Sequence, residues 1–512
     1  MEEIVVGIDS STQSTKAIAW TRSGVLVAEG RSPIALHNPR SYWFEQRCKD
    51  WWDSCCQALK VLMAQIDPGA IVGVSISNQR ETIGFLDHKG EEVRPAMLWL
   101  DERSRSQVAA LASEIGADVI HNISGRPVDI IPPLYRLAWL RENEPHAFEQ
   151  TVSFTDVHAY LVFRLCGVLK TSWFSADPMG YFNIQQKKWS QPLLDYLGLS
   201  SDRLPKTVPP GTLVGNVSDD ASVQTGLVGG TPIFAGGGDG QCAALGTNCT
   251  FPDQAYLNLG TAVVSGVWSP DCINNRAWRT EISATGKGYI LETCLRSGAF
   301  LINWFADRFL PGDRREKEFF KDLEAEAENI PIGCEGLITL PYWSGVMNPH
   351  WNSRARGCFI GLAGWHSPVH LYRSILEGVC LYQAEATRLL EKEAQTNIKK
   401  VVAIGGGASS PLWVQMMADA MGKQITVSNT IEASSLGAAM IAGYGVGWFG
   451  SIEAAAESMK GDSETVSPDA QVKKIWDRLL EIYGRIYADN ERTFNDLEAL
   501  ASMTLTSEKR IP

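Results

Sequence analysis

The sequence predicts an α/β protein of two domains, and three observations support this prediction. The chain of 512 residues is longer than one hydrophobic core usually holds, so two large domains are expected. Short apolar runs with the length of strands alternate with patterns that are typical of helices. A pattern of strand, turn and strand near the N-terminus returns after residue 252, which indicates a distant internal duplication.

The first predicted element is a hairpin over residues 4–20. The apolar run IVVGID ends in Asp9, and the run KAIAW resumes it after a turn rich in hydroxyl groups. A helix rich in tryptophan is expected at 48–65, followed by strands at 71–76 and 83–86. The first third of the chain is therefore expected to mix helices and strands.

The second half is expected to open with the related hairpin DQAYLNLGTAVVSGVW at 253–268. Apolar residues then recur every three or four positions over 370–391, which predicts a long helix. A strand at 400–404, a glycine turn and a helix from Pro411 follow, and a further helical pattern covers 471–493.

These elements divide the chain into three predicted parts. Pro252 and Asp253 supply a turn at the boundary between the two domains. The N-terminal domain is expected at 1–250, the C-terminal domain at 251–490 and a tail at 491–512, whose polar end from Ser502 should fray.

Composition excludes several classes of function. Hydrophobic residues at 45% and charged residues at 20% are typical of a globular protein, and the net charge of −12 with no cluster of Lys and Arg argues against nucleic acid as a partner. No signal peptide or membrane-spanning stretch is apparent, so a cytoplasmic protein without a membrane partner is expected. The eleven cysteines lack zinc-site spacing and predict reduced, buried thiols.

Two hairpin turns are candidate phosphate loops. Residues 9–16 (DSSTQSTK) carry hydroxyl groups behind Asp9, which could hold magnesium through water, although such turns usually satisfy only themselves. Gly260 and Thr261 lie between two strands, where glycine lets the main chain approach a phosphate, but a simple tight turn explains them equally well.

A third candidate loop is the strand-to-helix turn Gly405 to Ser410. A nucleotide could be accepted there at the N-terminus of the following helix. The turn lacks the Gly-Lys-Ser/Thr ending of a P-loop and does not match the G-x-G-x-x-G fingerprint in its required context. Nucleotide binding by those two folds is therefore disfavoured.

Asp239 is the most distinctive candidate for a catalytic residue. The apolar strand in FAGGGDGQ ends by exposing this one carboxylate between glycines, where it could take a proton from a substrate. Taken locally, an Asp that caps a turn is the more common explanation.

The segment NQRET at 78–82 is a candidate site for a polyol. Adjacent Arg80 and Glu81 could bind hydroxyl groups, with a surface ion pair as the alternative. Trp99 could add an apolar wall for sugar carbons, although a buried tryptophan in the core is more common.

Together these segments resemble the FGGY carbohydrate kinases over nearly the whole chain, from Ile4 to Tyr487. Two stretches resemble the family signatures: IPPLYRLAWLREN at 131–143, and GCFIGL at 357–362 followed by His370-Leu and SILE. The first departs once, with Arg136 where the family usually has Lys, which keeps the charge and changes its shape.

The resemblance implies two actin-like ATPase (RNase H-like) domains with an interdomain catalytic cleft that takes ATP and Mg²⁺. Asp239 would be the catalytic base, and Asp9 and Asp239 the metal ligands. The implied substrate-binding residues are Gln79, Arg80, Glu81, Trp99 and Asp239. The implied cofactor-binding residues are Ser11, Thr12, Gln13, Lys16, Gly260, Thr261, Gly298, Asn303, Gly406, Gly407 and Ser410.

The expected partner is a small sugar or polyol, and a homodimer is left open. NQRET resembles the glycerol kinase branch, but a glycerol-binding Tyr falls at Ile130 or Ile131, and Gly240 replaces a Gln. Residues 349–356 and 370–374 resemble the pentulose kinases instead, so a ketopentose such as D-xylulose is expected, with glycerol or another polyol as the alternative. An actin-like ATPase without a sugar substrate is the alternative from another class.

Overall fold

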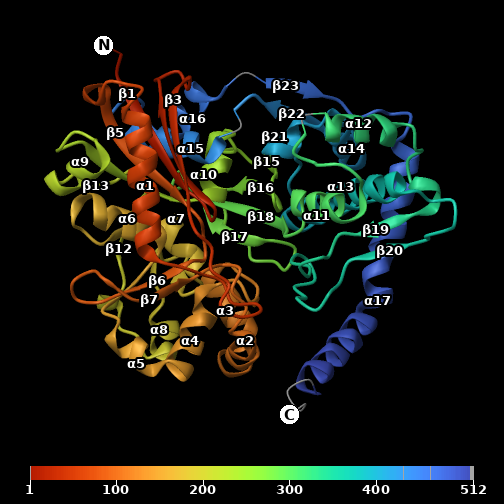
Figure 1. Ribbon diagram of the computed structural model, residues 1–512, viewed down its shortest axis with the longest axis horizontal. Helices are drawn as coiled ribbons and strands as arrows, with labels where there is room; N and C mark the ends of the chain where they lie inside the picture. The colour runs from red at the N-terminus through yellow and green to blue at the C-terminus, as the bar shows by residue number, and fades with distance from the viewer. Residues whose placement is uncertain (1, 317, 431, 462, 508–512) are drawn as a thin grey trace.

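The computed structural model describes residues 2–316, 318–430, 432–461 and 463–507, and two large sheets form the centres of its two halves (Figure 1). Within the described ranges, no helix combines the length and the apolar composition that a bilayer crossing requires. All eleven cysteines are free thiols, most of them buried, as the spacing of the cysteines predicts.

The first large sheet has six strands in the order β13-β14-β5-β1-β2-β3. Strand β1 pairs antiparallel with β2, in the predicted hairpin, and parallel with β5 on its other side. The predicted helix α1 (Cys48–Met63) packs closely against β2 and β3, where a Cβ on Gly30 of β3 would lie 2.0 Å from the Ala58 carbonyl oxygen. The strands are β1 (Ile4–Ser10), β2 (Ser14–Trp20), β3 (Leu26–Pro33), β5 (Ile71–Asn78), β13 (Leu213–Asn216) and β14 (Pro232–Gly238).

The second large sheet has seven strands in the order β17-β18-β16-β15-β21-β22-β23. Strand β15 pairs antiparallel with its hairpin partner β16 and parallel with β21, which repeats the arrangement of β2, β1 and β5. The strands are β15 (Gln254–Leu259), β16 (Val263–Ser269), β17 (Arg279–Ile282), β18 (Tyr289–Leu295), β21 (Lys400–Ile404), β22 (Gln424–Ser428) and β23 (Ser463–Val466).

Smaller sheets extend this framework. The predicted strand at 83–86 belongs to a sheet of four strands, in the order β4-β7-β6-β8, that lies below the first large sheet in Figure 1. Its strands are β4 (Glu45–Gln46), β6 (Ile83–Leu86), β7 (Glu92–Met97) and β8 (Ser153–Thr155). The two-stranded pairs are β9 (Lys170–Ser172) with β12 (Lys206–Val208), β10 (Phe182–Asn183) with β11 (Lys188–Trp189), and β19 (Ile338–Leu340) with β20 (Cys358–Ile360).

The predicted long helices of the second half are α13 (Pro368–Ala394), α14 (Pro411–Met421) and α17 (Lys473–Ser507). Helix α17 is longer than expected and enters the predicted tail, because Phe494 continues its buried stripe and packs against Tyr487. The backbone of α17 is helical through residues 502–507, the start of the segment that was expected to fray. Residues 508–512 lie outside the described part. The other helices are α2 (Arg105–Leu111), α3 (Ala117–Ser124), α4 (Pro133–Asn143), α5 (Pro145–Gln150), α6 (Val157–Cys166), α7 (Trp173–Ala176), α8 (Gln191–Leu197), α9 (Asp219–Thr225), α10 (Asp239–Gly246), α11 (Ala299–Phe309), α12 (Phe319–Glu328), α15 (Ala433–Gly445) and α16 (Ile452–Met459).

Helix α15 returns from the second half of the chain and packs on the first large sheet (Figure 1). Ser435 at its start donates a hydrogen bond to the Gly7 carbonyl of β1 (2.9 Å) and accepts one from the Trp20 indole of β2 (3.1 Å). The approach is close enough that a Cβ on Gly7 would lie 2.0 Å from the Ser435 carbonyl oxygen. The division of the chain near residue 250 stays a prediction, but residues from after it cover one face of the first sheet.

Candidate active site

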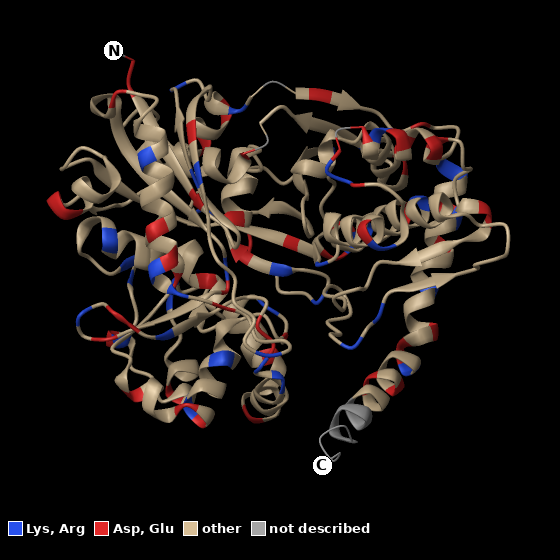
Figure 2. Cartoon of the chain, in the orientation of Figure 1, with Lys and Arg blue, Asp and Glu red and all other residues tan. Residues whose placement is uncertain are grey.

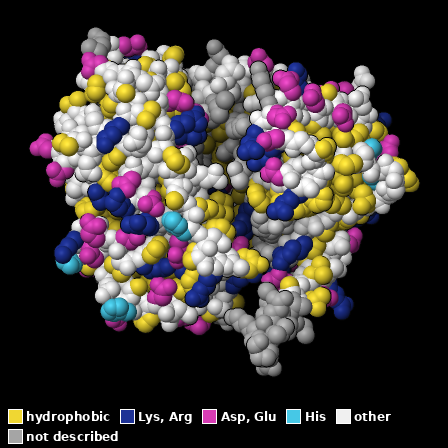
Figure 3. Space-filling model, viewed as in Figure 1, with side chains coloured by type: hydrophobic (Ala, Val, Ile, Leu, Met, Phe, Trp, Pro, Cys, Tyr) yellow, Lys and Arg dark blue, Asp and Glu magenta, His cyan; other side chains and the backbone are white. Residues whose placement is uncertain are grey.

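An inner cavity lies where the halves of the molecule meet, and an outer cavity lined by residues of the second half adjoins it. The inner cavity has a volume of about 420 Å³ and the outer cavity about 990 Å³, and both are lined by Gly260, Thr261 and Gly406. The space-filling view shows the molecule hollowed between its two halves (Figure 3). Two of the three predicted phosphate loops therefore separate these cavities.

The turn between β1 and β2 forms one wall of the inner cavity. Ser11, Thr12 and Lys16 line this cavity, as predicted for a phosphate loop. The Ser11 amide and hydroxyl both donate to the Ser14 carbonyl, so part of the turn satisfies itself. Gln13 is not among the lining residues, and its carbonyl accepts a hydrogen bond from the Ile34 amide (2.8 Å).

Asp9 is buried at the end of β1 and lines the same cavity. The Ser77 hydroxyl donates to its carboxylate (3.1 Å). Burial raises the pKa of Asp9 to about 7, and repulsion from the carboxylate of Asp239 adds to the rise. The positive charge of Lys16 lowers the pKa and opposes both effects. Lys16 in turn forms an ion pair with Glu432 (2.6 Å), which ties this loop to the second half of the chain.

The turn between β15 and β16 is held by the start of helix α11. The Gly298 amide donates to the Thr261 carbonyl and the Ala299 amide to the Gly260 carbonyl, both at 2.9 Å. A Cβ on Gly298 would lie 2.8 Å from the Gly260 oxygen, so glycine is needed for this close approach. The structure thus places Gly298 behind the loop, whereas Asn303 lines the outer cavity.

The glycine turn after β21 borders the outer cavity. Gly406, Gly407 and Ser410 line it, and an added Cβ on Gly406 would meet only open space. The Ser410 hydroxyl accepts the Trp413 amide (3.1 Å) and so caps α14. Part of the remaining wall is apolar, of the kind that accepts a flat ring, and part is charged. The apolar side chains include Ile302, Tyr372, Leu376, Leu412 and Trp413, and the charged ones are Lys321, Glu324 and Glu328.

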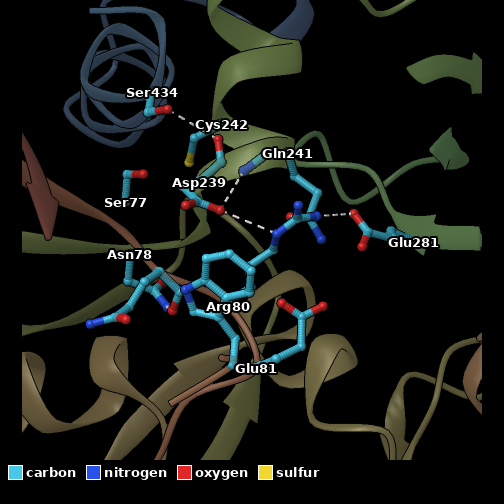
Figure 4. A network of polar contacts seen from close by, with 12 residues as sticks. Ser77, Asn78, Arg80, Glu81, Asp239, Gln241, Cys242, Glu281 and Ser434 are labelled. Atoms are coloured by element: carbon cyan, nitrogen blue, oxygen red, sulfur yellow. Dashed lines mark hydrogen bonds and ion pairs between the residues drawn. The ribbon is translucent and has the colours of Figure 1, made fainter. Parts of the chain in front are cut away.

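Asp239 is the first residue of α10 and projects into the inner cavity from the end of β14. Its carboxylate faces Arg80 Nε at 3.2 Å and accepts the Gly240 amide at 2.8 Å (Figure 4). The side chain is 37% exposed, enough to meet a substrate in the cavity. Burial raises the pKa of Asp239 to about 6, although Arg80 lowers it.

The glycines that flank Asp239 make room for Arg80. A Cβ on Gly240 would lie 2.7 Å from the guanidinium carbon, and one on Gly238 would lie 2.8 Å from Arg80 Cδ. A larger residue after Asp239 would therefore displace the arginine that holds the carboxylate. This contact gives a physical reason for Gly240.

A buried charged cluster surrounds Arg80 and Glu81, where the first half of the molecule meets β17 and β18 (Figure 2). Arg80 forms ion pairs with Glu281 (2.5 Å) and Glu292 (3.1 Å), and Glu81 with Arg126 (2.9 Å) and Arg279 (3.1 Å). Figure 4 shows the Arg80 guanidinium between Asp239 and Glu281. The charged cluster consists of Arg80, Glu81, Arg126, Asp177, Arg279, Glu281 and Glu292.

Five members of the charged cluster were missed by the sequence analysis: Arg126, Asp177, Arg279, Glu281 and Glu292. They come from four distant segments, and no spacing connects them. The sequence of β17, Arg-Thr-Glu-Ile, has one apolar residue and gives no local sign that Arg279 and Glu281 are buried. Buried charges of opposite sign must find partners, and these partners become visible only in the folded structure.

Glu81 has a left-handed backbone, with a φ of 49°, which is unfavourable for a residue with a side chain. Arg136 of the first signature stretch stabilises it by donating to the Glu81 carbonyl. The same guanidinium donates to the Asp101 carbonyl (3.3 Å), and the arginine is fully buried. The planar fork of Arg136 thus reaches two carbonyls, which the single ammonium of a lysine matches less well.

Two of the predicted substrate-binding residues, Trp99 and Gln79, lie in different places relative to the inner cavity. Trp99 lines the inner cavity, and its indole donates to the Thr12 hydroxyl (2.9 Å). Gln79 is buried behind the cavity and donates to Gln46 (2.9 Å), and it is not among the lining residues.

The carboxylates of Asp9 and Asp239 fit the ligand preference of Mg²⁺. This ion usually takes one or two carboxylates and completes its shell with phosphate oxygens and water. The two carboxylates repel one another in the inner cavity, as the raised pKa of Asp9 indicates, and a cation would relieve that repulsion. Among the described residues no group of three or more His, Cys, Asp or Glu forms a closed metal site.

Comparison with known proteins gives matches along the whole chain. Residues 4–246 match the N-terminal domain of the FGGY family of carbohydrate kinases, and residues 255–446 match its C-terminal domain. Xylulose kinase from Bacillus subtilis is 30% identical over 490 residues, which cover 94% of this chain and 96% of that protein. Glycerol kinase from Aromatoleum aromaticum is 28% identical over 475 residues, which cover 90% and 93%.

The fold also matches a solved structure. The crystal structure of xylulose kinase from Rhodospirillum rubrum is similar with a TM-score of 0.88 at 25% identity, over 96% of this chain and 100% of that chain. This match confirms the predicted fold of two actin-like domains.

Proposed function

Because the chain belongs to the FGGY family of carbohydrate kinases, we propose that it transfers the γ-phosphoryl group of ATP to a hydroxyl of a ketopentose such as D-xylulose. One observation carries the proposal. The carboxylate of Asp239 projects into an inner cavity of sugar size that shares the Gly260 and Thr261 loop with a larger, partly apolar outer cavity.

In the proposed reaction, ATP lies in the outer cavity with its phosphates at the glycine loops. Asp239 accepts the proton of the sugar hydroxyl as the oxygen attacks the γ-phosphorus, and ADP leaves with the electrons of the broken bond. Main-chain amides near Gly260 and Gly406 and the Lys16 ammonium face the transferred group, where they stabilise its charge. Arg80 keeps the carboxylate of Asp239 directed into the cavity.

Asp9 and Asp239 would hold Mg²⁺, which when bound neutralises charge on the phosphates. The two carboxylates would supply oxygen ligands in the inner cavity, which the proposed phosphate loops also line. The raised pKa of Asp9 means that this carboxylate binds a proton readily in the absence of a cation.

The acceptor is assigned from the lining of the inner cavity. Ile131 lies at the cavity wall near the position where the glycerol kinases are expected to carry a tyrosine, and Gly240 offers no side chain. A triol would lose hydrogen bonds there, at about 1 kcal/mol or more each. The alternative, glycerol or another polyol, is favoured by Arg80 and Glu81, which both line the cavity.

Replacement of Asp239 tests the assigned chemistry. Asp239→Asn keeps the shape of the side chain but removes the base, so we expect sugar phosphorylation to fall at least about a thousandfold, as loss of a base typically costs two to four orders of magnitude. Nucleotide binding, measured by calorimetry, should persist. Asp253→Asn, which changes a carboxylate near the surface, is the matched control and should keep normal turnover.

A screen of acceptors tests the substrate class. ATP hydrolysis coupled to ADP detection is measured with ketopentoses, hexuloses, aldonates, glycerol and erythritol. We expect a ketopentose to give the highest kcat/KM. Hydrolysis at one rate with and without every sugar would contradict the kinase and favour an actin-like ATPase.

A further inference from the structure

His158 is a buried polar side chain that the proposed reaction does not use. It is the second residue of α6, and it is fully buried. Its Nε2 atom accepts a hydrogen bond from the main-chain amide of Gly236 at 3.1 Å. Gly236 belongs to β14, the strand that ends directly before Asp239. The imidazole therefore contacts the strand that carries the proposed base.

Strand β14 is irregular at the residue that His158 contacts. Phe234 pairs with Ser75 of β5, but Gly237 pairs with Ser77, so β14 holds one residue more than β5 between these two pairs. Such a β-bulge takes main-chain groups out of the ladder, and it changes the direction of the strand beyond it. The direction in which the strand presents Asp239 depends on this bulge.

The bulge places the Gly236 amide where it needs an acceptor from outside the sheet. Within the described strands, the register of β14 with β5 omits Ala235 and Gly236. The Ala235 amide donates to the Thr212 carbonyl, and the Ala235 carbonyl accepts the Gly211 amide, both at 2.9 Å. Gly236 is buried, and a buried amide without an acceptor is costly, so the imidazole stabilises this form of the bulge.

His158 can accept this hydrogen bond only as a neutral imidazole. A main-chain amide always donates, so Nε2 must be without a proton, and the proton of the ring lies on Nδ1. Burial lowers the pKa of His158 to about 3, although a hydrogen bond with the main chain of Lys170 opposes this effect. The ring is therefore a hydrogen-bond acceptor at neutral pH and is unsuited to carry a proton.

The start of α6 holds the imidazole in place. Asp156 caps this helix by accepting the Ala159 amide (2.8 Å). The Ser175 hydroxyl lies within hydrogen-bonding distance of Asp156 (3.1 Å) and of Asn78 (3.2 Å), at the end of β5. Helix α6 is thus fixed to the strand beside the bulge, and His158 is a rigid support for the Gly236 amide.

We infer that His158 is a positioning residue for phosphoryl transfer: its Nε2 atom fixes the bulge of β14 at Gly236 and so keeps the carboxylate of Asp239 in the place of the base. This inference rests on the proposed function, because it takes Asp239 as the base. His158 is not among the residues that line the inner cavity, so it acts through Gly236 and not by contact with the substrate.

Three variants of His158 separate the acceptor atom from the bulk of the ring. His158→Leu keeps an apolar volume but removes the acceptor, so we expect kcat for sugar phosphorylation to fall about tenfold or more, while KM for ATP changes by less than about twofold. In His158→Gln the amide oxygen can take the place of Nε2, and kcat should return to within about threefold of the native value. His158→Asn, whose amide is too short to reach Gly236, should behave like His158→Leu. It replaces that variant if thermal unfolding shows that the leucine variant does not fold.

A change in the core of the same helix is the control. Leu161→Ala opens a cavity in the first core and leaves the bond between His158 and Gly236 in place, so it should lower the free energy of unfolding and keep kcat. Three results would overturn the inference: a native kcat in folded His158→Leu or His158→Asn, a glutamine variant no more active than the leucine variant, or an equal loss of kcat in Leu161→Ala.

The inference and the proposed function fail in different ways. If the proposed function is wrong, either Asp239→Asn keeps the native rate or the native protein phosphorylates no sugar. If only the inference is wrong, Asp239→Asn loses phosphorylation, while folded variants of His158 that lack the acceptor keep it.

Discussion

Asp239 combines two demands on a single side chain. As the proposed base it must be deprotonated near neutral pH, yet burial raises its pKa to about 6. Burial also raises the pKa of Asp9, to about 7, and repulsion between the carboxylates of Asp9 and Asp239 contributes to this rise. Both carboxylates therefore reduce the stability of the protein at the pH where they would function.

The first prediction concerns stability and pH in metal-free buffer. A carboxyl group whose pKa rises from 3.8 to about 6 on folding favours the native state below pH 4, and this contribution is lost as the pH rises through about 6. Asp239→Asn cannot titrate, so we expect its unfolding temperature relative to the native protein to be higher at about pH 8 than at about pH 5.

Differential scanning calorimetry of both proteins at the two pH values measures this difference. The comparison cancels the titration of buried carboxyl groups that do not interact with Asp239, Asp156 among them. The pKa of Asp9 falls in the variant, because the repulsion from Asp239 is lost, and this change shifts the relative stability in the same direction. A variant whose relative stability is the same at both pH values would show that burial does not raise the pKa of Asp239.

At the scale of residues, the sequence pointed to the proposed catalytic carboxylates but not to the side chains that contact them. Asp239 was conspicuous because glycines flank it, and Asp9 because hydroxyl groups follow it. The partners of Arg80 could not be predicted, because Glu281 and Glu292 lie some two hundred positions away and reach it only after the two halves pack. Ion pairing across that separation depends on tertiary structure, which local patterns do not encode.

At the scale of elements, strands β17 and β18 connect the second sheet to the acceptor site. Glu281 of β17 pairs with Arg80 and, at 2.7 Å, with Arg126, both from the first half of the chain. Arg279 of the same strand pairs with Glu81. The geometry of the base thus depends on how this strand pair docks against the first half.

The second prediction is that Glu281→Gln lowers both stability and activity. Its carboxylate is fully buried among three guanidinium groups, those of Arg80, Arg126 and Arg279. Removal of one partner from a buried ion pair typically costs about 3 kcal/mol of unfolding free energy. We also expect kcat/KM for the sugar to fall about tenfold or more, because Arg80 loses a partner and directs Asp239 less well.

Urea unfolding and steady-state kinetics check this prediction together. Glu453→Gln is the matched control, since it breaks a partly exposed ion pair with Lys287 and should change the unfolding free energy by less than about 1 kcal/mol. If Glu281→Gln behaved like this control in both measurements, the charged cluster would not position the base.

Elements with strong local patterns were predicted well. The hairpins around Asp9 and Gly260 and the helix at 370–391 agree with the structure because their apolar spacing is regular and glycine or polar turns bound them. The sequence did not predict the small sheet that contains β6, because its strands β4 and β8 have only two and three residues. The length of α17 was underestimated because its last turns carry many polar residues.

For the whole molecule, the contact of α15 with the first sheet is the main connection that crosses the division of the chain. The third prediction follows from Gly7, where an added methyl group would lie 2.0 Å from the Ser435 carbonyl oxygen. Gly7→Ala must move the helix or the strand, and overpacking of this kind costs about 1–3 kcal/mol or more.

Urea unfolding measures the cost, with Gly364→Ala as the control, because a Cβ there meets no neighbouring atom within 4 Å. We further expect Gly7→Ala to raise KM for ATP, since β1 carries Asp9, one residue before its end at Ser10, beside the proposed phosphate loop. Native values of both stability and KM would show that α15 can shift without disturbing the site.

The position of α15 also has a consequence for synthesis of the chain on the ribosome. All strands of the first sheet have emerged once Gly238 leaves the exit tunnel, but Val5, Ile18 and Phe234 await the α15 residues Leu436 and Met440 that complete their cluster. The nascent first half therefore carries an uncovered apolar face while strands β15 to β22 of the second sheet are translated. It is the kind of intermediate that chaperones bind, and a circular permutation that starts the chain at Ala433 would shorten its lifetime.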